Sequence, residues 1–173
     1  SVYGLSGDAQ RIDIMPNKFA SIAAQDGTIK LFGGGVQYKS LVNVVDVVRA
    51  MKYLGEGDYT GTYHLSNENM TVKDVAEICK QVNPNITLLS TDDEIPNKGY
   101  TLSNKKLLST GFKFLYNIHD SIREMITAWS VKPQPKELEY ILRGQNEYID
   151  NRGKISNYEL VEPINMIGYI TSV

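Results

Sequence analysis

A glycine run followed by a glutamine and a lysine is the segment of this sequence best suited to bind a charged ligand. The run Gly33–Gly35 ends an apolar stretch, and Gln37 and Lys39 follow it. A glycine turn exposes backbone N–H groups, and a lysine beside it adds a compact positive charge, which together suit a diphosphate. The same residues could instead form a tight hairpin turn with a solvated lysine. The residues alone leave both interpretations open.

Other polar segments could also contact a ligand. Asn17 comes directly after Pro16 at the start of a predicted helix, and its amide could face a ligand or satisfy loop carbonyls. The stretch from Ser66 to Asn69 lies between a predicted strand and a predicted helix, where α/β sheets carry their ligand-facing loops. Lys98 lies in a proline-containing loop and could supply a second cation. Each segment has a plain alternative, as a loop group, a polar connection or a solvated charge.

The sequence contains no recognisable catalytic set. No Gly-x-Gly-x-x-Gly follows a predicted strand, no Tyr-x-x-x-Lys occurs, and no serine nucleophile elbow is present. His64 and His119 lie in different predicted elements without a cysteine or carboxylate at ligand spacing, which argues against a zinc site. Cys79 is the single cysteine, so it cannot form an internal disulfide. Its place on the apolar face of a predicted helix indicates a buried, inert thiol.

The elements that must position these residues alternate between strands and helices, which is typical of an α/β layer fold. We predict strands at 28–32, 41–45, 61–65 and 86–89, and a strand end at residues 1–4. We predict helices at 16–25, at 46–54 with Asp46 as its cap, at 103–108 and at 118–129. A further helix begins at the capping box Thr71–Asp74. Helical spacing predicts inward faces, and in the helix 46–54 these residues are Val47, Val48, Met51 and Leu54.

Composition narrows the classes of function. Eighteen basic and twenty acidic residues among 173 give a net charge of −2, and no basic run occurs. This pattern argues against binding to nucleic acid or to an anionic membrane. Charged and polar residues interrupt the apolar stretches well short of the ~20 residues that span a bilayer, and no signal-peptide pattern is present. We therefore expect a cytoplasmic protein.

The chain divides by composition into three parts. Residues 1–131 carry the α/β pattern, 132–147 form a proline-containing linker and a short helix, and 148–173 contain short β-like pieces. The first residue is Ser1 and both ends fall in strand-like sequence. We therefore expect a segment of a longer protein.

Six blocks, taken in order, resemble the C-terminal half of the extended short-chain dehydrogenase/reductases that act on nucleotide sugars, the epimerases and dehydratases. The blocks are Ser1–Gly4, Met15–Phe19, Phe32–Asp46, Thr62–Asp74, Asn97–Tyr100 with the later Gly111-Phe112, and Ile118–Trp129. The resemblance implies the C-terminal part of a Rossmann-type fold, followed here by a short β-rich segment. From residue 150 onward the tail resembles, more weakly, the opening strands of a cupin-type sugar-epimerase domain.

This resemblance implies a function. The chain would be the substrate-binding portion of an NAD(P)-dependent nucleotide-sugar epimerase or dehydratase in polysaccharide or glycan precursor synthesis. Its partner would be a nucleotide-diphosphate sugar. In the family, NAD or NADP and the catalytic Ser/Thr, Tyr and Lys belong to an upstream half, so this segment alone is expected to be inactive. The complete protein is implied to be a homodimer.

The resemblance also assigns residues to the substrate. Lys39 and Lys98 stand where the family has phosphate-binding arginines, so the charge is kept while the bidentate geometry is lost. His64 stands where the family has a strand-end asparagine, which bears on the sugar that is accepted. The implied substrate-binding set is Asn17, Phe32, Gly33, Gln37, Lys39, His64 and Lys98.

Two other functions stay open. The chain could be a non-catalytic binding or structural subunit that kept the substrate-domain fold without a cofactor site. It would then need a partner chain, because half of a parallel sheet leaves an edge and apolar faces uncovered. A reductase or decarboxylase of the same family is the other alternative, since the residues that separate these activities lie in the upstream half.

Overall fold

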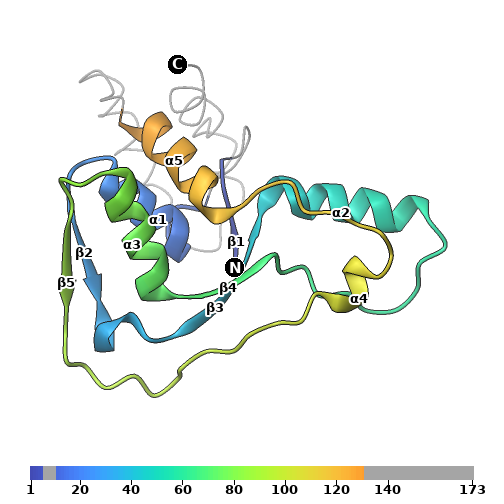
Figure 1. Cartoon of the computed structure of the whole chain (residues 1–173), viewed down its shortest axis with the longest axis horizontal. Coiled ribbons are helices and arrows are strands. Elements are labelled where there is room, and N and C mark those ends of the chain that lie inside the picture. Colours follow the sequence, from blue (N-terminus) through green and yellow to red (C-terminus); the bar gives the residue numbers. More distant parts are fainter. Residues whose placement is uncertain (6–10, 131–173) are drawn as a thin grey trace, which may run out of the picture.

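A computed structural model describes residues 1–5 and 11–130, which form a body and an arm that extends from it (Figure 1). The predicted linker and short helix at 132–147 and the predicted β-rich segment at 148–173 lie outside the described residues. The described elements are β1 (Val2–Tyr3), α1 (Met15–Ala23), β2 (Thr28–Leu31), the short 3-10 turn η1 (Phe32–Gly35), β3 (Tyr38–Asn43), α2 (Val44–Glu56), β4 (Glu68–Thr71), α3 (Val72–Val82), β5 (Thr87–Ser90), α4 (Lys105–Leu108) and α5 (Ile118–Trp129).

Two small sheets supply the strands of the described chain. In one sheet β3 is central, parallel to β1 with Val2 opposite Val42 and antiparallel to β4 with Tyr38 opposite Thr71. In the other sheet β2 and β5 pair in parallel. Helices lie between the members of each parallel pair along the chain, as parallel pairing requires. The predicted α/β class is confirmed.

Helices α1, α3 and α5 pack against one another and against the strands to form the core of the body (Figure 1). Cys79 on α3 is fully buried there, as predicted, and burial raises the pKa of its thiol to about 12. The largest fully buried side chains of this core are Tyr3, Ile29, Leu41, Ile86, Ile118, Ile122, Met125 and Val75.

Local hydrogen bonds explain where two of these helices begin. The Thr71 hydroxyl accepts the Asp74 N–H at 3.1 Å, and the Asp74 carboxylate accepts the Thr71 N–H at 2.8 Å. This is the predicted capping box of α3. At α5, the Asn117 side-chain oxygen accepts the Asp120 N–H at 2.8 Å. The helix that follows has the predicted bounds, 118–129.

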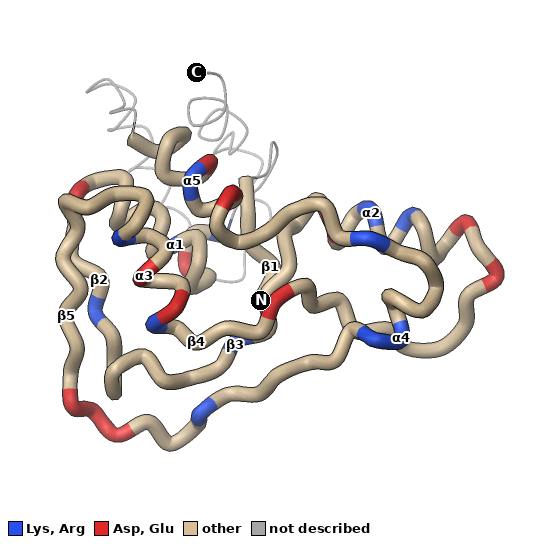
Figure 2. The backbone as a smooth tube through the Cα atoms, in the orientation of Figure 1, with Lys and Arg blue, Asp and Glu red and all other residues tan. Residues whose placement is uncertain are grey.

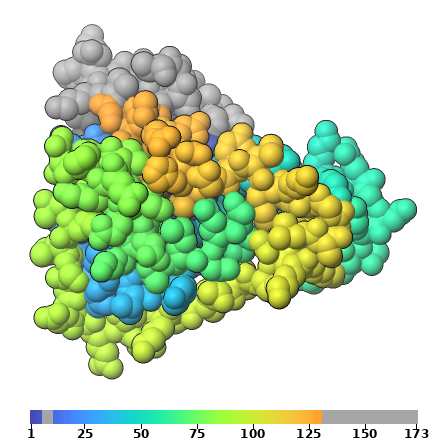
Figure 3. Space-filling view, viewed as in Figure 1, coloured from blue at the N-terminus to red at the C-terminus, as the bar shows by residue number. Residues whose placement is uncertain are grey.

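The arm consists of α2 together with residues 104–116, which include α4 (Figure 3). Its own small core contains the buried Ala50, Leu107 and Phe112, with Tyr53 and Leu54 packed against them. The Tyr53 hydroxyl donates to a carbonyl of the 104–116 segment at 2.6 Å. The arm is therefore held together by one small aromatic and aliphatic cluster.

The boundary between β3 and α2 differs from the prediction. The strand covers Tyr38–Asn43 rather than 41–45, and the helix begins at Val44. Asn43, not Asp46, is the N-cap, because its side-chain oxygen accepts the Val45 N–H at 2.9 Å. Asp46 lies in the first turn, and its carboxylate accepts backbone N–H groups of the 104–116 segment.

The orientation of α2 also differs from the prediction. Val48 and Met51, expected to face inward, are 61% and 67% exposed. Asp46 and Ala50 are the buried residues of this helix. Asp46 decides which face of α2 points inward, because its carboxylate accepts the N–H groups of residues 115 and 116. The apolar stripe that contains Val48 and Met51 is therefore turned away from the core of the arm. Leu54 does pack into the arm as predicted.

Residues 61–65 were predicted as a strand, and within the described structure they form none; the strand of this region is β4. Tyr63 and Leu65 instead pack against the core of the arm. Lys106 Nζ lies 4.2 Å from the centroid of the Tyr63 ring and donates to the Thr62 carbonyl at 3.0 Å. The segment is thus held by side chains of the arm.

Basic and acidic residues are both spread over the described chain, with short single-sign groups at the acidic run Asp92–Glu94 and at Lys105 and Lys106 of α4 (Figure 2). Among the described residues, no helix combines the length and the apolar character needed to cross a bilayer. The described part of the chain thus carries charges of both signs.

Candidate functional site

The glycine run predicted to face a ligand is η1, a single turn between β2 and β3. Gly33 and Gly34 have φ of 54° and 70°, in the left-handed region that favours glycine. A Cβ at Gly33 would lie 2.2 Å from the Ile95 side chain and 2.7 Å from the Asp93 carbonyl. The turn therefore requires glycine here, because the loop of residues 91–100 (the 91–100 loop) passes directly beside it.

The 91–100 loop also contacts the start of β3. The Tyr38 N–H donates to the Lys98 carbonyl at 2.8 Å, and Tyr38 and Gly99 form an isolated parallel bridge. A Cβ at Gly99 would lie 2.0 Å from the Tyr38 carbonyl oxygen. Lys39 and Lys98, far apart in sequence, are therefore carried by two backbone segments that touch.

The charge of these two lysines is not used within the described structure. None of the ion pairs among residues 1–5 and 11–130 involves Lys39 or Lys98. Lys98 is exposed and Lys39 is partly buried. The acidic run Asp92–Glu94 lies at the other end of the loop, beside Gly33. An anion is therefore favoured at the lysine end of this edge rather than at the turn.

Gln37 links the turn to α3 and leaves one acceptor unused. Its side-chain nitrogen donates to the Phe32 carbonyl at 3.4 Å, and its backbone carbonyl accepts the Val72 N–H at 3.0 Å. Its side-chain oxygen is buried without a hydrogen-bond partner in the described residues. A buried acceptor in this state costs about 1–3 kcal/mol. This oxygen is a natural position for a donor from a ligand or a water.

Asn17 lies at the other end of β3. Its side-chain oxygen accepts the Gly4 N–H at 3.1 Å, and its nitrogen donates to the Arg11 carbonyl at 2.9 Å. These bonds tie the loop after β1 to α1. β1 ends opposite Asn43, roughly 13 Å along the strand from Lys39. A role of Asn17 in ligand binding stays a prediction. A ligand that contacts both Asn17 and Lys39, at the two ends of β3, would have to be elongated.

His64 lies on the arm side of the molecule. It is exposed, and its neighbours Tyr63 and Leu65 pack against the core of the arm. No hydrogen bond or ion pair connects its side chain to another described residue. The described contacts therefore bring together the turn at Phe32–Gly35, Gln37 and the two lysines, but neither His64 nor Asn17.

Two aromatic residues of this region were missed from the sequence. Tyr38 is 47% exposed and Tyr100 is 70% exposed, and each lies next to the contact between β3 and the 91–100 loop. Phe32, predicted as a site residue, is 56% exposed. Exposed rings beside cations can stack on bases or sugars. The sequence does contain a signal for these residues, because Tyr38 directly precedes Lys39 and Tyr100 directly follows Gly99.

The polar stretch Ser66–Asn69, for which the sequence left a ligand-facing loop and a polar connection open, acts as a polar connection. Asn69 belongs to β4, and its side-chain oxygen accepts the Ser40 hydroxyl at 2.7 Å and the Leu102 N–H at 3.0 Å. Ser66 is buried. These groups fasten residues 100–104 to the sheet, and so help to hold the 91–100 loop in place.

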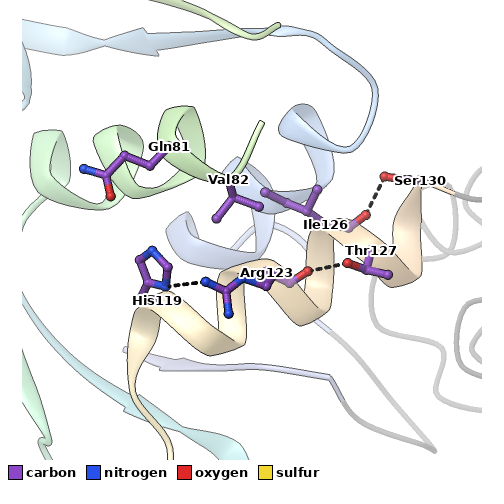
Figure 4. A pocket seen from close by; sticks show the side chains of 7 residues that line it. All are labelled: Gln81, Val82, His119, Arg123, Ile126, Thr127 and Ser130. Carbon is purple, nitrogen blue, oxygen red and sulfur yellow. Dashed lines mark hydrogen bonds between the residues drawn. The ribbon is translucent and has the colours of Figure 1, made fainter. Parts of the chain in front are cut away.

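A surface pocket of about 530 Å³ lies elsewhere, between α3 and α5 (Figure 4). It is near the C-terminal end of α3, whereas Val72 at the opposite end contacts Gln37, roughly 14 Å away along the helix. None of the predicted site residues lines it. Its lining residues are Gln81, Val82, His119, Arg123, Ile126, Thr127 and Ser130.

The described residues contain no group of three His, Cys, Asp or Glu side chains that could hold a metal ion. They also contain no dinucleotide-binding turn. Such a turn leads from a strand into a helix, whereas η1 leads into strand β3.

Comparison of the sequence with known proteins gives a relative that matches part of the chain. No family model matches the sequence. Anthocyanidin reductase from Arabidopsis thaliana is 34% identical over 97 residues, which cover 54% of this chain and 28% of that protein. The chain therefore spans less than a third of that relative.

Comparison of the structure gives similar solved structures. The UDP-glucose 4-epimerase of Thermus thermophilus, in complex with NAD, has a TM-score of 0.62 at 19% identity, covering 73% of this chain and 43% of its own. The Thermotoga maritima UDP-glucose 4-epimerase, with UDP-glucose, has 0.63 at 17%, covering 73% and 42%. The Methanobrevibacter ruminantium UDP-N-acetylglucosamine 4-epimerase, with UDP-N-acetylmuramic acid, has 0.61 at 21%, covering 75% and 43%.

At these identities the similarity shows the fold. The chain has part of the Rossmann-type fold of extended short-chain dehydrogenase/reductases, and the predicted fold class is confirmed. The similar structures are NAD-dependent nucleotide-sugar epimerases and dehydratases, which is the group that the six sequence blocks resemble. The chain spans less than half the length of each of these proteins.

Proposed function

We propose that this chain is the nucleotide-sugar-binding portion of an NAD(P)-dependent epimerase or dehydratase of polysaccharide or glycan precursor synthesis. The observation that carries the proposal is the contact between β3 and the 91–100 loop, which holds Lys39 and Lys98 on touching segments without ion-pair partners. The fold supports it, because solved structures with this fold were obtained with UDP-glucose and with UDP-N-acetylmuramic acid. The complete enzyme would be a cytoplasmic homodimer.

In this proposal each group at the edge has a role. The diphosphate lies at the lysine end, where Lys39 and Lys98 neutralise its charge. The unused oxygen of Gln37 accepts a donor from the ligand, and the exposed rings of Tyr38 and Tyr100 stack against base or sugar. Phe32 and Gly33 shape the turn beside them, while Asn17 and His64 contact the more distant ends of an elongated ligand.

The chain's part in catalysis is to hold and orient the sugar. NAD(P), bound by another part of the complete enzyme, would accept and return a hydride at a sugar carbon. The residues of this chain fix the position of the diphosphate and so the position of the sugar relative to that cofactor. The described residues supply binding, and we expect the chain alone to be inactive.

The direct test is calorimetric titration of the full chain with UDP-glucose. Lys39→Ala should weaken binding about tenfold or more, because a hydrogen bond to a charged group contributes about 1.5–3 kcal/mol. Lys39→Arg should keep most of the affinity. Lys52→Ala, an exposed lysine of the arm, is the matched control and should bind as the unchanged protein does. Equal affinity of the Lys39→Ala and Lys52→Ala variants would remove Lys39 from the site.

The similarity to anthocyanidin reductase favours a second candidate, a reductase of a substrate without a diphosphate. Such a protein would have no use for two unpaired lysines on touching segments. Titration with UDP alone separates the two functions. Binding of UDP that is lost in both Lys39→Ala and Lys98→Ala supports the nucleotide-sugar site, whereas absence of UDP binding favours the reductase.

A further inference from the structure

Two polar side chains on neighbouring strands hold the backbone of Leu102, just beyond the 91–100 loop. Asn69 on β4 contacts both polar backbone groups of Leu102, because its side-chain oxygen accepts the N–H and its nitrogen donates to the carbonyl, each at 3.0 Å. The Ser40 hydroxyl on β3 also accepts the Leu102 N–H, at 2.9 Å, and donates to the Asn69 side-chain oxygen at 2.7 Å. We call this arrangement of Ser40, Asn69 and the Leu102 backbone the Leu102 clamp.

The strand register brings the two side chains of the Leu102 clamp together. Ser40 and Asn69 are direct partners in the antiparallel pair β3–β4, so their side chains lie on the same face of the sheet. Neighbouring residues of a strand point to opposite faces, so Lys39 lies on the other face of β3. The Leu102 clamp therefore acts on a ligand at Lys39 through the backbone, without touching the ligand.

The Leu102 clamp bears on the position of Lys98 more than on that of Lys39. Lys39 belongs to β3 and pairs there with Met70 of β4. Lys98 belongs to a loop, and its carbonyl accepts the Tyr38 N–H at 2.8 Å shortly before the chain reaches Leu102. Loss of the Leu102 clamp would free the C-terminal end of this loop and with it Lys98, whereas Lys39 would stay in its strand.

On the basis of the proposed function, we propose that Asn69 and Ser40 are positioning residues that let this edge distinguish a nucleoside diphosphate from a nucleoside monophosphate. A diphosphate can use both lysines, whereas a monophosphate is bound through Lys39. While the Leu102 clamp holds the loop, less conformational freedom is lost when Lys98 binds the second phosphate. Without it, the contact of Lys98 with the second phosphate is weakened and the contact of Lys39 with the first is kept.

The test is calorimetric titration of the full chain with UDP and with UMP. Asn69→Ala should weaken UDP binding at least about threefold, which corresponds to the loss of one weak hydrogen bond, and leave UMP binding unchanged. Asn69 is exposed, so its replacement leaves the core of the body intact. A general loosening of the fold would weaken both nucleotides alike. Equal losses for UDP and UMP, or unchanged binding of both, would overturn the proposal.

Asn104→Ala is the matched control for Asn69→Ala. The Asn104 side-chain nitrogen donates to the Ser66 carbonyl at 2.8 Å, so this variant also loses a bond from an asparagine amide to the backbone. It lies on the arm side of the Leu102 clamp, farther along the chain from Lys98. The ratio of the UDP and UMP affinities should therefore stay that of the unchanged chain.

A double-mutant cycle shows whether the Leu102 clamp acts through Lys98. Asn69→Ala combined with Lys98→Ala should bind UDP no more weakly than Lys98→Ala alone, because the lysine that the clamp positions is already gone. Additive losses would mean that Asn69 acts by another route and would overturn the proposal. Ser40→Ala removes the other side chain of the clamp and should lower the preference for UDP over UMP in the same direction, so the test stays decisive if Asn69→Ala folds poorly.

Failure of this proposal can be told from failure of the proposed function. If the unchanged chain does not bind UDP, the nucleotide-sugar site is wrong and the positioning role falls with it. If the unchanged chain binds UDP and Lys98→Ala weakens binding, while Asn69→Ala and Ser40→Ala do not, the site stands and only the role of the Leu102 clamp is wrong.

Discussion

Helix α2 of the arm and helix α5 of the body have similar lengths, yet only α5 buries its apolar face. In α5 the apolar face is fully buried against α1 and α3. In α2 the buried positions are Asp46 and Ala50, and the apolar stripe is exposed. Helical spacing of apolar residues therefore predicts that a face is apolar, but not that the face is buried.

The candidate site lies where the body ends rather than in the arm. The contact between β3 and the 91–100 loop is fastened by the Tyr38–Gly99 bridge and by Asn69, all at the edge of the sheet. The arm has a core of its own, against which Tyr63 and Leu65, the neighbours of His64, pack. A binding edge on a well-packed body is more rigid than one on a peripheral arm, which favours the lysine edge as the place where a ligand is positioned.

The sharpest contrast between the two regions is the cost of losing one apolar side chain. Ile122→Ala in α5 should cost about 2–5 kcal/mol in the free energy of unfolding, because Ile122 is fully buried in the core of the body. Val48→Ala on α2 should change it by no more than about 0.5 kcal/mol. Urea unfolding followed by circular dichroism measures both. Similar costs for the two variants would mean that α2 is covered within this chain.

Asp46 offers a way to loosen the arm alone. Its carboxylate accepts the N–H groups of Leu115 at 3.0 Å and Tyr116 at 3.0 Å and pairs with Arg49. Asp46→Ala should cost about 1–3 kcal/mol through the N–H groups left without an acceptor.

Hydrogen exchange is the measurement that locates this effect. The amides of residues 104–116 should exchange faster in Asp46→Ala, while those of α5 keep their protection. Asp46→Asn keeps an acceptor oxygen and is the matched control with a smaller effect. Uniformly faster exchange across α5 as well would show that body and arm unfold as one unit.

Much of the body could be predicted from the sequence because its signals are local. The capping box at Thr71–Asp74 and the helical spacing in α5 depend only on neighbouring residues, and the structure confirms both. The bounds of β3 and the strand predicted at 61–65 were wrong because short apolar runs become strands only where a partner strand lies beside them. For 61–65, the described partner is the side-chain cluster of the arm.

The parts of the candidate site are visible in the sequence, but their arrangement is not. The glycine run with Gln37 and Lys39 is visible as a pattern, and so is Lys98. Their proximity depends on a backbone contact between residues about sixty positions apart, where only glycine fits at position 99 because the Tyr38 backbone lies against it. A contact of that kind has no local signature. The exposed Tyr38 and Tyr100 could not be separated from core aromatics for the same reason.

Glu68 gives the smallest expected effect, at the junction between β4 and α5. Its carboxylate accepts the Ile118 N–H at 2.8 Å. Burial raises its pKa, while the hydrogen bond from the Ile118 N–H opposes this. The native state therefore holds this proton more readily than the unfolded state does. Its contribution to stability is largest below the ordinary pKa of a glutamate and is lost as the pH rises through the raised native value.

The urea midpoint between about pH 4 and pH 7 tests this prediction. Glu68→Gln should remove the part of the decline in stability that Glu68 causes as the pH rises. Glu77→Gln, at an exposed position of α3, is the matched control and should keep the slope of the unchanged protein. If the urea midpoint of Glu68→Gln changes with pH as steeply as that of the unchanged protein, burial of Glu68 does not contribute to the pH dependence of stability.

Chemical-shift mapping of the ¹⁵N-labelled chain with UDP-glucose tests the central claim most directly, because it reports on the body edge and the arm in one experiment. The account predicts that the amides of Tyr38, Lys39 and Gly99 shift with increasing ligand, while those of Ala50 and Leu107 in the arm do not. Shifts confined to the arm or to the pocket between α3 and α5, or no shifts at all, would contradict a nucleotide-sugar site at the lysine edge.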